Sequence, residues 1–587
     1  MQNASYSLNR RGLIQFGIAV GAQALAGPMI LNRARSSTET LAPNAPGFRR
    51  LFPDLPAARH DGDDLMRLAL GDGRNLSGMS APPEVRKNHK GEPARDAEGR
   101  LIIAATAEDK QDDEENFGLP AGYTYLGQFV DHDITFSPGD SLDPAHQPSA
   151  ANLRSARFDL DCLYGRGPAD QPYLYEADGR RLVSGRRLAA STRNGVPADH
   201  PRAQGRALIG DKRNDENVLV SQLHGVFRAF HNQIAHDDPK ADFSALQSQV
   251  TRHYQWVLLT DFLPRICGRE TIESILPGFG HGGRTGYYRP HLKLTKPLRF
   301  GEIPLEFSGA AYRFGHSLIR PAYRINLHMT GTAAERRDNP ELAGRRLIFA
   351  AAQYGGLNGF RPIPEEWGID WRLYFEIDRK LDPARIGDGR RRVQAAYKID
   401  TSLTNPLAFL PEFSEAGKGG DLAADPNGQP RPRPGAVSNL AARNLLRGFQ
   451  IGLPSGQEVA RAMGIDPIAD RDLLVGKATV DGLSENRSIT EYGASFRDSA
   501  PLWFYILAES QHLWAQKARA HSGTKEQRDA IPTVLGPVGA QIVAETFVAL
   551  MQLDPRSILH AGPDWSPRYL RNNRFSMAEL VLGAHLA

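Results

Sequence analysis

Side chains suited to proton transfer or metal binding gather in five short segments. The first, YTYLGQFVDHDITF at 123–136, combines an apolar helical pattern with Gln128, Asp131 and His132. These three stand at i, i+3 and i+4, so they share one helical face. Polar groups clustered on an aromatic-rich helix need a buried partner or a ligand. The His-Asp pair also occurs twice elsewhere in the chain, so the pair alone identifies no site.

The second segment supplies oxygen ligands. Four positions alternate along it: Ser155, Arg157 through its carbonyl, Asp159 and Asp161. An extended backbone would place them on one side. With Asp133 they form a set of hard oxygen ligands suited to Ca²⁺. An acidic strand edge in water is the alternative, and the spacing alone does not decide between the two.

The other three segments are weaker taken singly. GDKRNDEN at 210–217 precedes the strongest helical pattern, and its Asp or Asn side chains could simply cap that helix. YRFGHSLI at 312–319 presents His316 on an apolar helical pattern, where a lone histidine is more often a core residue than a ligand. RNLLRGFQIGLPSG at 443–456 carries Asn444 and Arg447 one helical turn apart.

The elements expected to position these groups are mainly helical. Apolar residues recur at helical spacing in five stretches: 123–133, 217–235, 310–319, 439–450 and 537–553. Three polar, Gly- and Pro-rich stretches are expected to be loops: 76–116, 278–288 and 417–435. Alternating strand patterns are sparse, so the sequence predicts a mainly α fold with few short strands.

Composition excludes several classes of protein. Of the 587 residues, 41% are apolar and 24% charged, which is ordinary globular usage and excludes a mainly disordered or polytopic membrane chain. The net charge of +4 is too small to favour a nucleic-acid partner. Two cysteines allow at most one disulfide and no cysteine zinc site. Neither a repeat nor a clean linker follows the N-terminus, so residues 31–587 are expected to form a single domain with long loops.

The N-terminus is expected to be an export signal. Asn9-Arg10-Arg11 leads into an uncharged, mildly hydrophobic stretch at 12–30 that contains an Ala-Leu-Ala cleavage motif. Paired arginines in this position resemble a twin-arginine signal. We therefore predict a signal over 1–30, a periplasmic or secreted protein, and no stable membrane span in the mature chain. An uncleaved anchor or a disordered tail is the alternative.

Taken in order, the five segments resemble the animal-type haem peroxidases. GQFVDHD, FDLDCLYG, GDKRNDE, YRFGHSLI and RNLLRGFQIGLP follow the order of that family, and the resemblance covers about 48–554. It implies a mostly α-helical fold with haem b between a distal and a proximal helix.

The resemblance also implies roles for single residues on the distal side. His132 corresponds to the distal histidine, Gln128 to its nearby glutamine and Arg213 to the distal arginine. A neutral imidazole can move a proton between the peroxide oxygens, and a fixed guanidinium can stabilise the charge that develops. Asp131 and Glu216 match carboxylates that can become ester-linked to haem methyl groups.

On the proximal side, the resemblance implies that His316 is the iron ligand. Asn444 would accept the Nδ1 proton of His316 through its carbonyl, which leaves Nε2 for iron. Arg313 and Arg447 correspond to arginines near the haem propionates. The calcium positions of the family fall on the five oxygen-bearing residues named above: Asp133, Ser155, Arg157, Asp159 and Asp161.

Two departures from the family pattern narrow the function. Asn217 stands where some members carry a methionine bonded to a haem vinyl group, so that bond cannot form and strongly oxidising chloride chemistry is not expected. Arg313 stands where the fatty-acid dioxygenases of the superfamily carry a radical tyrosine, and Tyr312 is displaced by about 100° around a helix.

The functional hypothesis is a haem peroxidase. It would reduce hydrogen peroxide and oxidise phenolic or aromatic donors, or halides such as bromide, iodide and thiocyanate. The alternatives are a haem-dependent fatty-acid dioxygenase and a secreted, peroxinectin-like adhesion protein, although the chain contains no RGD tripeptide.

Overall fold

A computed structural model describes most of the chain. The described residues are 47–73, 75–80, 112–137, 151–189, 197–279, 289–292, 298–329, 344–351, 355–377, 393–416, 422–424, 430–562 and 565–584. The predicted export signal at 1–30 lies outside them, and so do parts of the three predicted loops, at 81–111, 280–288, 417–421 and 425–429.

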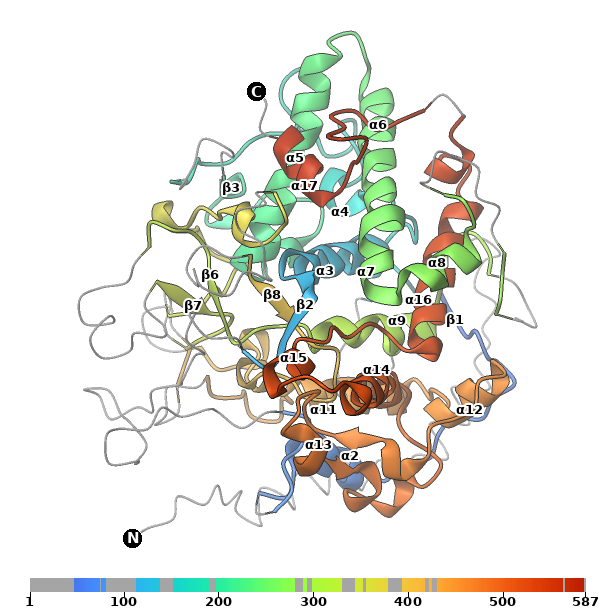
Figure 1. The fold of residues 1–587 in the computed structure, drawn as a ribbon. Coiled ribbons are helices and arrows are strands. Elements are labelled where there is room, and N and C mark those ends of the chain that lie inside the picture. The colour runs from blue at the N-terminus through green and yellow to red at the C-terminus, as the bar shows by residue number, and fades with distance from the viewer. Residues whose placement is uncertain are drawn as a thin grey trace.

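Helices dominate the described residues (Figure 1). The α-helices are α2 (Gly62–Leu70), α3 (Gly122–Ile134), α4 (Asp161–Tyr164), α5 (Val218–Asp237), α6 (Phe243–Val257), α7 (Leu263–Cys267), α8 (Arg269–Ile275), α9 (Leu305–Gly309), α11 (Leu440–Gln450), α12 (Gly456–Ala462), α13 (Gly482–Glu485), α14 (Leu502–Ala520), α15 (Lys525–Asp529), α16 (Pro537–Leu553) and α17 (Met577–Gly583). The prediction of a mainly α fold is confirmed, and α3, α5, α11 and α16 match four of the five predicted helices.

The strands are short and pair two by two. They are β1 (Gly47–Arg49), β2 (Glu115–Pro120), β3 (Arg202–Ala203), β4 (Arg206–Ala207), β5 (Glu302–Pro304), β6 (Ala322–Arg324), β7 (Arg345–Leu347), β8 (Ala395–Tyr397), β9 (Leu474–Val475) and β10 (Arg487–Ser488). β1 pairs with β5 in parallel, with Phe48 opposite Ile303. The pairs β2–β8, β3–β4, β6–β7 and β9–β10 are antiparallel.

Helix α3 lies near the centre of the molecule, with α5 and α6 above it and α11 and α14 below it in Figure 1. Phe129 of α3 stacks on Phe227 of α5 with ring centroids 4.6 Å apart, and Tyr254 of α6 meets both rings edge-on. These aromatic contacts fix the crossing of the three helices, because each ring is fully buried in the main core.

The helix predicted over 310–319 is wrong in type and length. The chain there forms a 3-10 helix, η4 (Ala311–His316), and proceeds to strand β6. The start of η4 has no side-chain cap, Gly315 is a weak helix former, and Pro321 cannot extend an α-helix.

Two further expectations concern cysteines and membranes. Cys162 and Cys267 are both buried and free, so they form no disulfide. Among the described residues, we find no helix with the length and apolar character needed to cross a bilayer.

Candidate functional site

Helix α3 brings three of the predicted residues together on one face. Gln128 and Asp131 are partly exposed, whereas His132 is buried. Phe129 and Val130 are fully buried on the opposite side. The i, i+3, i+4 spacing therefore clusters the polar groups as expected.

His132 is held through its Nδ1 atom. That nitrogen lies 2.8 Å from Oδ1 of Asn214 in the short 3-10 helix η2 (Lys212–Asp215), and Nε2 lies 3.6 Å from a carboxylate oxygen of Glu216. Burial, and then the positive charge of Arg213, lower the pKa of His132 to about 4. The imidazole is therefore neutral near pH 7, which is the form that accepts a proton.

Arg213 is fixed beside His132. Its Nη2 donates to Asp211 at 2.8 Å and to the carbonyl oxygens of His132 and Thr135 at 3.2 and 2.5 Å. Its Nη1 lies 4.0 Å from the carboxylate of Asp131. Because these contacts set the direction of the guanidinium, it can stabilise negative charge near Asp131 without rearranging.

Glu216 follows η2 and contacts Gln128, whose Nε2 donates to the carboxylate. Burial, followed by repulsion from Glu412, raises the pKa of Glu216 to about 8. Asn217 donates through Nδ2 to Oε1 of Gln128 at 3.1 Å, and its Oδ1 accepts from two backbone N–H groups in the first turn of α5. The capping role considered for this segment is confirmed, and the same residue orients Gln128.

His316 and Asn444 are in contact, but not through the predicted atoms. Nδ2 of Asn444 lies 2.7 Å from Nδ1 of His316, and Oδ1 of Asn444 accepts from Nη1 of Arg313 at 2.9 Å. A guanidinium only donates, so the amide oxygen faces Arg313 and the amide nitrogen faces the imidazole. The resemblance implied the opposite amide orientation, in which the Asn444 carbonyl accepts the Nδ1 proton. Ligation through Nε2 requires the amide to turn over.

The segment that carries His316 packs directly against α3. Tyr312 donates to the carbonyl oxygen of Gly127 at 3.2 Å, which brings the two predicted histidines onto adjoining elements. Burial, and then the charge of Arg313, lower the pKa of His316 to about 3. Arg447 is buried one helical turn after Asn444 on α11.

The acidic residues predicted to bind calcium also come together. Oxygen atoms of Asp133, Asp159 and Asp161 lie within 4.8 Å of one another. Burial, and then repulsion from Asp161, raise the pKa of Asp133 well above its usual value. Burial raises the pKa of Asp161 to about 7, although Arg154 opposes this rise. Asp133 is fully buried and the other two are partly exposed, with Arg154 and Arg157 pairing with Asp161 and Asp159. The clustered oxygen set suits Ca²⁺.

The backbone around these carboxylates is not extended as predicted. Ala156 and Leu160 have positive φ angles of 53° and 61°, which fold 155–161 into a tight loop. Ser155 donates through Oγ to Asp159 at 2.8 Å, and the side chain of Arg157 pairs with the same carboxylate at 2.9 Å. The loop therefore clusters the oxygens by turning, and not by strand alternation.

Three buried residues beside His132 were not singled out from the sequence. Asn214 stands between the predicted Arg213 and Glu216, and His224 lies in the apolar pattern of α5. His200 contacts the backbone of Asn214 through Nε2 at 3.1 Å. Polar residues recur along α5, so nothing in the sequence distinguished His224, and nothing local marked His200.

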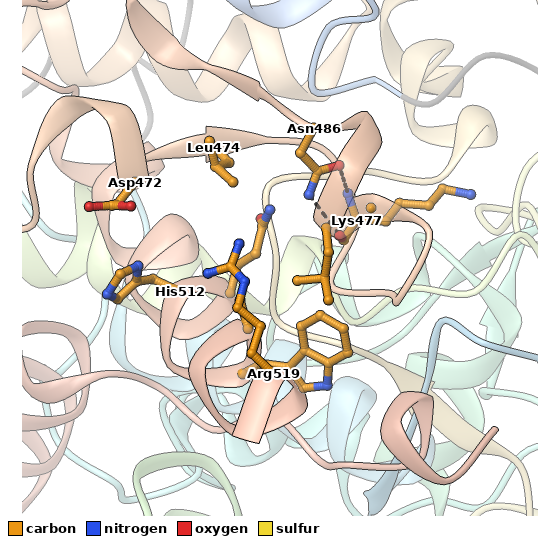
Figure 2. Close-up of a pocket in the computed structure, with 11 residues that line it drawn as sticks. Asp472, Leu474, Lys477, Asn486, His512 and Arg519 are labelled. Atoms are coloured by element: carbon orange, nitrogen blue, oxygen red, sulfur yellow. Dashed lines mark hydrogen bonds between the residues drawn. The ribbon is translucent and has the colours of Figure 1, made fainter. Parts of the chain in front are cut away.

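A separate hollow lies between α14 and the β9–β10 hairpin (Figure 2). Asp472, His512 and Arg519 line it, and Asn486 holds the backbone of Lys477 through two hydrogen bonds at 2.9 and 3.2 Å. None of the residues predicted to form the site lines this hollow.

Residues 142–359 match the family model described as animal haem peroxidase. Human thyroid peroxidase is 26% identical over 236 residues, which cover 36% of this chain and 24% of that protein. Dog thyroid peroxidase is 23% identical over 503 residues, which cover 71% of this chain and 46% of that protein. The chorion peroxidase of Aedes aegypti is 27% identical over 124 residues, which cover 20% of this chain and 15% of that protein. The chain thus spans less than half the length of each of these relatives.

Two solved structures are similar over most of the chain. Peroxidase A from Dictyostelium discoideum aligns with a TM-score of 0.44 at 15% identity, covering 85% of this chain and 92% of that one. The fatty acid alpha-dioxygenase of Oryza sativa aligns with a TM-score of 0.45 at 14% identity, covering 92% and 85%.

Proposed function

We propose that this chain, which belongs to the animal haem peroxidase family, reduces hydrogen peroxide with a bound haem while oxidising a small electron donor. Phenolic or aromatic compounds, bromide, iodide and thiocyanate are the donors that we propose. The observation that carries the proposal is the buried His132, whose Nδ1 lies 2.8 Å from Oδ1 of Asn214 while hydrogen bonds fix Arg213 beside it.

In this proposal the side chains divide the work of cleaving the peroxide bond. His132 takes the proton from one peroxide oxygen at Nε2 and returns it to the other. Arg213 stabilises the charge on the departing oxygen, because its guanidinium stays protonated and is held in place. Gln128 and Glu216 lie beside His132 and orient water or a small anion next to its Nε2.

The residues around His316 fit a haem. A Cβ atom added to Gly315 would meet no atom within 4 Å, so there is room for a flat group beside His316. We propose His316 as the iron ligand, with Arg313 and Arg447 near the propionates and Asn444 turned to accept from His316. A bound haem would supply the redox chemistry.

We further propose that Asp133, Ser155, Asp159, Asp161 and the carbonyl of Arg157 bind Ca²⁺. The clustered carboxylates support this proposal, since their oxygens lie within 4.8 Å of one another and burial raises the pKa values of Asp133 and Asp161. Asp133 is adjacent to His132, so the ion would have a structural role in fixing the end of α3. The predicted export signal leads us to propose the periplasm or the exterior of the cell as the location.

The test is the visible spectrum of the purified, haem-loaded protein before and after hydrogen peroxide. We expect the haem spectrum to change on adding peroxide and to return when phenol, bromide or iodide is supplied. Oxygen uptake with a fatty acid and without peroxide would instead identify a dioxygenase. A haem protein that reacts with neither peroxide nor fatty acid would contradict the proposal.

A further inference from the structure

One residue, Asn214, contacts three imidazoles beneath α3: its side-chain amide meets two of them and its backbone oxygen meets the third. Asn214 is fully buried, and its Oδ1 lies 2.8 Å from Nδ1 of His132. Its Nδ2 lies 3.1 Å from Nδ1 of His224, and its backbone oxygen lies 3.1 Å from Nε2 of His200. His224 and His200 are themselves buried and meet edge-to-face with ring centroids 4.9 Å apart.

The chemistry of the amide dictates which nitrogen atoms carry protons. An amide oxygen only accepts and an amide nitrogen only donates. His132 must therefore donate from Nδ1, and the lone pair of its neutral ring lies on Nε2. By the same rule, His224 accepts at Nδ1. His200 donates from Nε2 to a carbonyl oxygen, which leaves its Nδ1 as an acceptor, and that atom has no hydrogen-bond partner in the described residues.

The orientation of the Asn214 amide is thus set on the side opposite His132. If the amide turned over, its nitrogen would face His132, and the proton of that imidazole would move to Nε2. The contact with His224 opposes this turn, because the turned amide would place its oxygen against the lone pair on Nδ1 until the His224 proton moved from Nε2 to Nδ1. The neighbouring Asp215 cannot replace Asn214, since its carboxylate is bound by two nitrogen atoms of Arg202 at 2.6 and 2.8 Å.

We propose that Asn214 is a positioning residue that fixes the tautomer of His132, and that His224 fixes the orientation of the Asn214 amide. The inference rests on the proposed peroxidase function, in which Nε2 of His132 accepts a proton from peroxide. That step requires the tautomer with the proton on Nδ1. It assigns a purpose to the buried polar group formed by Asn214, His224 and His200, which would otherwise be a costly feature in an apolar core.

The first experiment compares Asn214→Leu with Asn214→Asp in the haem-loaded protein. Leucine removes the acceptor, whereas aspartate keeps an oxygen facing His132. We expect Asn214→Leu to slow the reaction with peroxide at least about tenfold, since general-base catalysis contributes on the order of a hundredfold or more. Asn214→Asp should remain within about threefold of the wild-type rate. Equal rates for Asn214→Leu and the wild type would overturn the proposal.

A double-mutant cycle separates positioning from a general structural effect. If Asn214 acts through His132, Asn214→Leu should cause no further loss in a His132→Ala background. An equal loss in both backgrounds would show that Asn214 acts elsewhere. Asn116→Leu is the matched control, because Asn116 is also fully buried but contacts Thr533, far along the chain. This control should lower thermal stability without changing the reaction with peroxide.

Two readouts do not depend on turnover. Nitrogen-15 NMR of labelled histidine should show His132 protonated at Nδ1 in the wild type and Asn214→Asp, and a shifted tautomer population in Asn214→Leu. Binding of hydrogen cyanide to the haem needs a base for its proton, so it should slow in Asn214→Leu. A wild-type His132 protonated at Nε2 would overturn the inference. A wild-type, haem-loaded protein that does not react with peroxide would instead contradict the proposed function.

Discussion

The two histidines that flank the proposed haem position have opposite partners at Nδ1. His132 faces an amide oxygen, and His316 faces an amide nitrogen. The family resemblance of the five motifs predicted both histidines, but it gave no orientation for Asn214 and the opposite orientation for Asn444. The orientation of Asn444 depends on Arg313, and that of Asn214 depends on His224, which is a contact between segments that only the folded chain defines.

These different roles predict different losses on substitution. His316→Ala should abolish stable haem ligation, because it removes the proposed iron ligand. His132→Ala should retain haem and slow the reaction with peroxide by about a hundredfold or more, since it removes only the proton acceptor. Haem content and stopped-flow spectra measure the two effects. Loss of haem in His132→Ala together with normal turnover in His316→Ala would reverse the assignment of the two sides.

Asp131 and Glu216 give a second prediction for single side chains. Both carboxylates keep accessible surface, 41% and 25% of their side chains, as ester formation requires. Each ester would join a carboxylate oxygen to a haem methyl carbon, which loses one hydrogen, while the two electrons reduce peroxide. After peroxide treatment, acid-solvent extraction should release less haem, and Asp131→Ala or Glu216→Ala should each restore part of it. Complete extraction from active, treated protein would contradict the prediction.

Among the elements, α5 shows how one residue can serve both a helix and the site. Asn217 appeared in the sequence mainly as the absence of a methionine, but its side chain caps α5 and holds Gln128. The helix itself followed from apolar periodicity. Its link to α3 did not, because that link joins residues almost ninety positions apart in the chain.

Two substitutions separate these roles of Asn217. Asn217→Asp keeps an oxygen to cap α5 but loses the donor to Gln128, so its stability should stay near that of the wild type. Asn217→Ala loses both contacts and should lower the free energy of unfolding by about 1 kcal/mol. Denaturation midpoints measure the loss of the helix cap. The affinity for small anions measures the loss of the contact with Gln128. An equal loss of stability in both variants would show that the Gln128 contact, and not the cap, stabilises the helix.

A prediction about calcium concerns the loop at 155–161. Its oxygen-bearing residues were predictable, but its folded-back course was not, because positive φ angles at Ala156 and Leu160 are rare for these residue types. Asp159→Ala should lower the calcium content and the thermal midpoint, since a ligand that binds only the folded state stabilises it. Asp170→Ala, at an exposed surface pair with Arg166, is the control. Metal analysis that finds no calcium in active protein would exclude the site.

At the scale of the whole molecule, the core holds several neutral imidazoles. Burial is the main cause that lowers the pKa of His132, His200, His231, His253 and His316, to values of about 3 to 4. Composition gave the number of histidines but not their burial, which depends on how the elements that carry them pack. Buried carboxylates such as Glu114, with its pKa raised to about 8, have the opposite dependence on pH. The stability of the whole protein therefore depends on pH through opposing contributions of imidazoles and carboxylates. The contribution of one histidine can be measured only by substituting it.

His231 on α5 allows that isolation, because its hydrogen bonds go to residues outside the proposed haem site. Its Nε2 donates to the carbonyl of Arg180 at 2.7 Å, and Nδ1 accepts from Tyr164 at 3.0 Å. Burial lowers its pKa from 6.5 to about 4. The folded-state pKa is below the unfolded value, so this contribution to stability is complete above about pH 6.5 and is lost as the pH falls towards 4.

His231→Gln should therefore be less sensitive to acid than the wild type. Between about pH 7 and about pH 4.5, the wild type should lose about 2 to 3 kcal/mol more free energy of unfolding than the variant, as follows from the pKa difference. His236→Gln on the same helix is the control, since His236 is exposed and its replacement should leave the pH dependence unchanged. Urea denaturation across this pH range measures both. Parallel curves for His231→Gln and the wild type would mean that His231 becomes protonated in the folded protein at its ordinary pKa, which its complete burial between Arg180 and Tyr164 argues against.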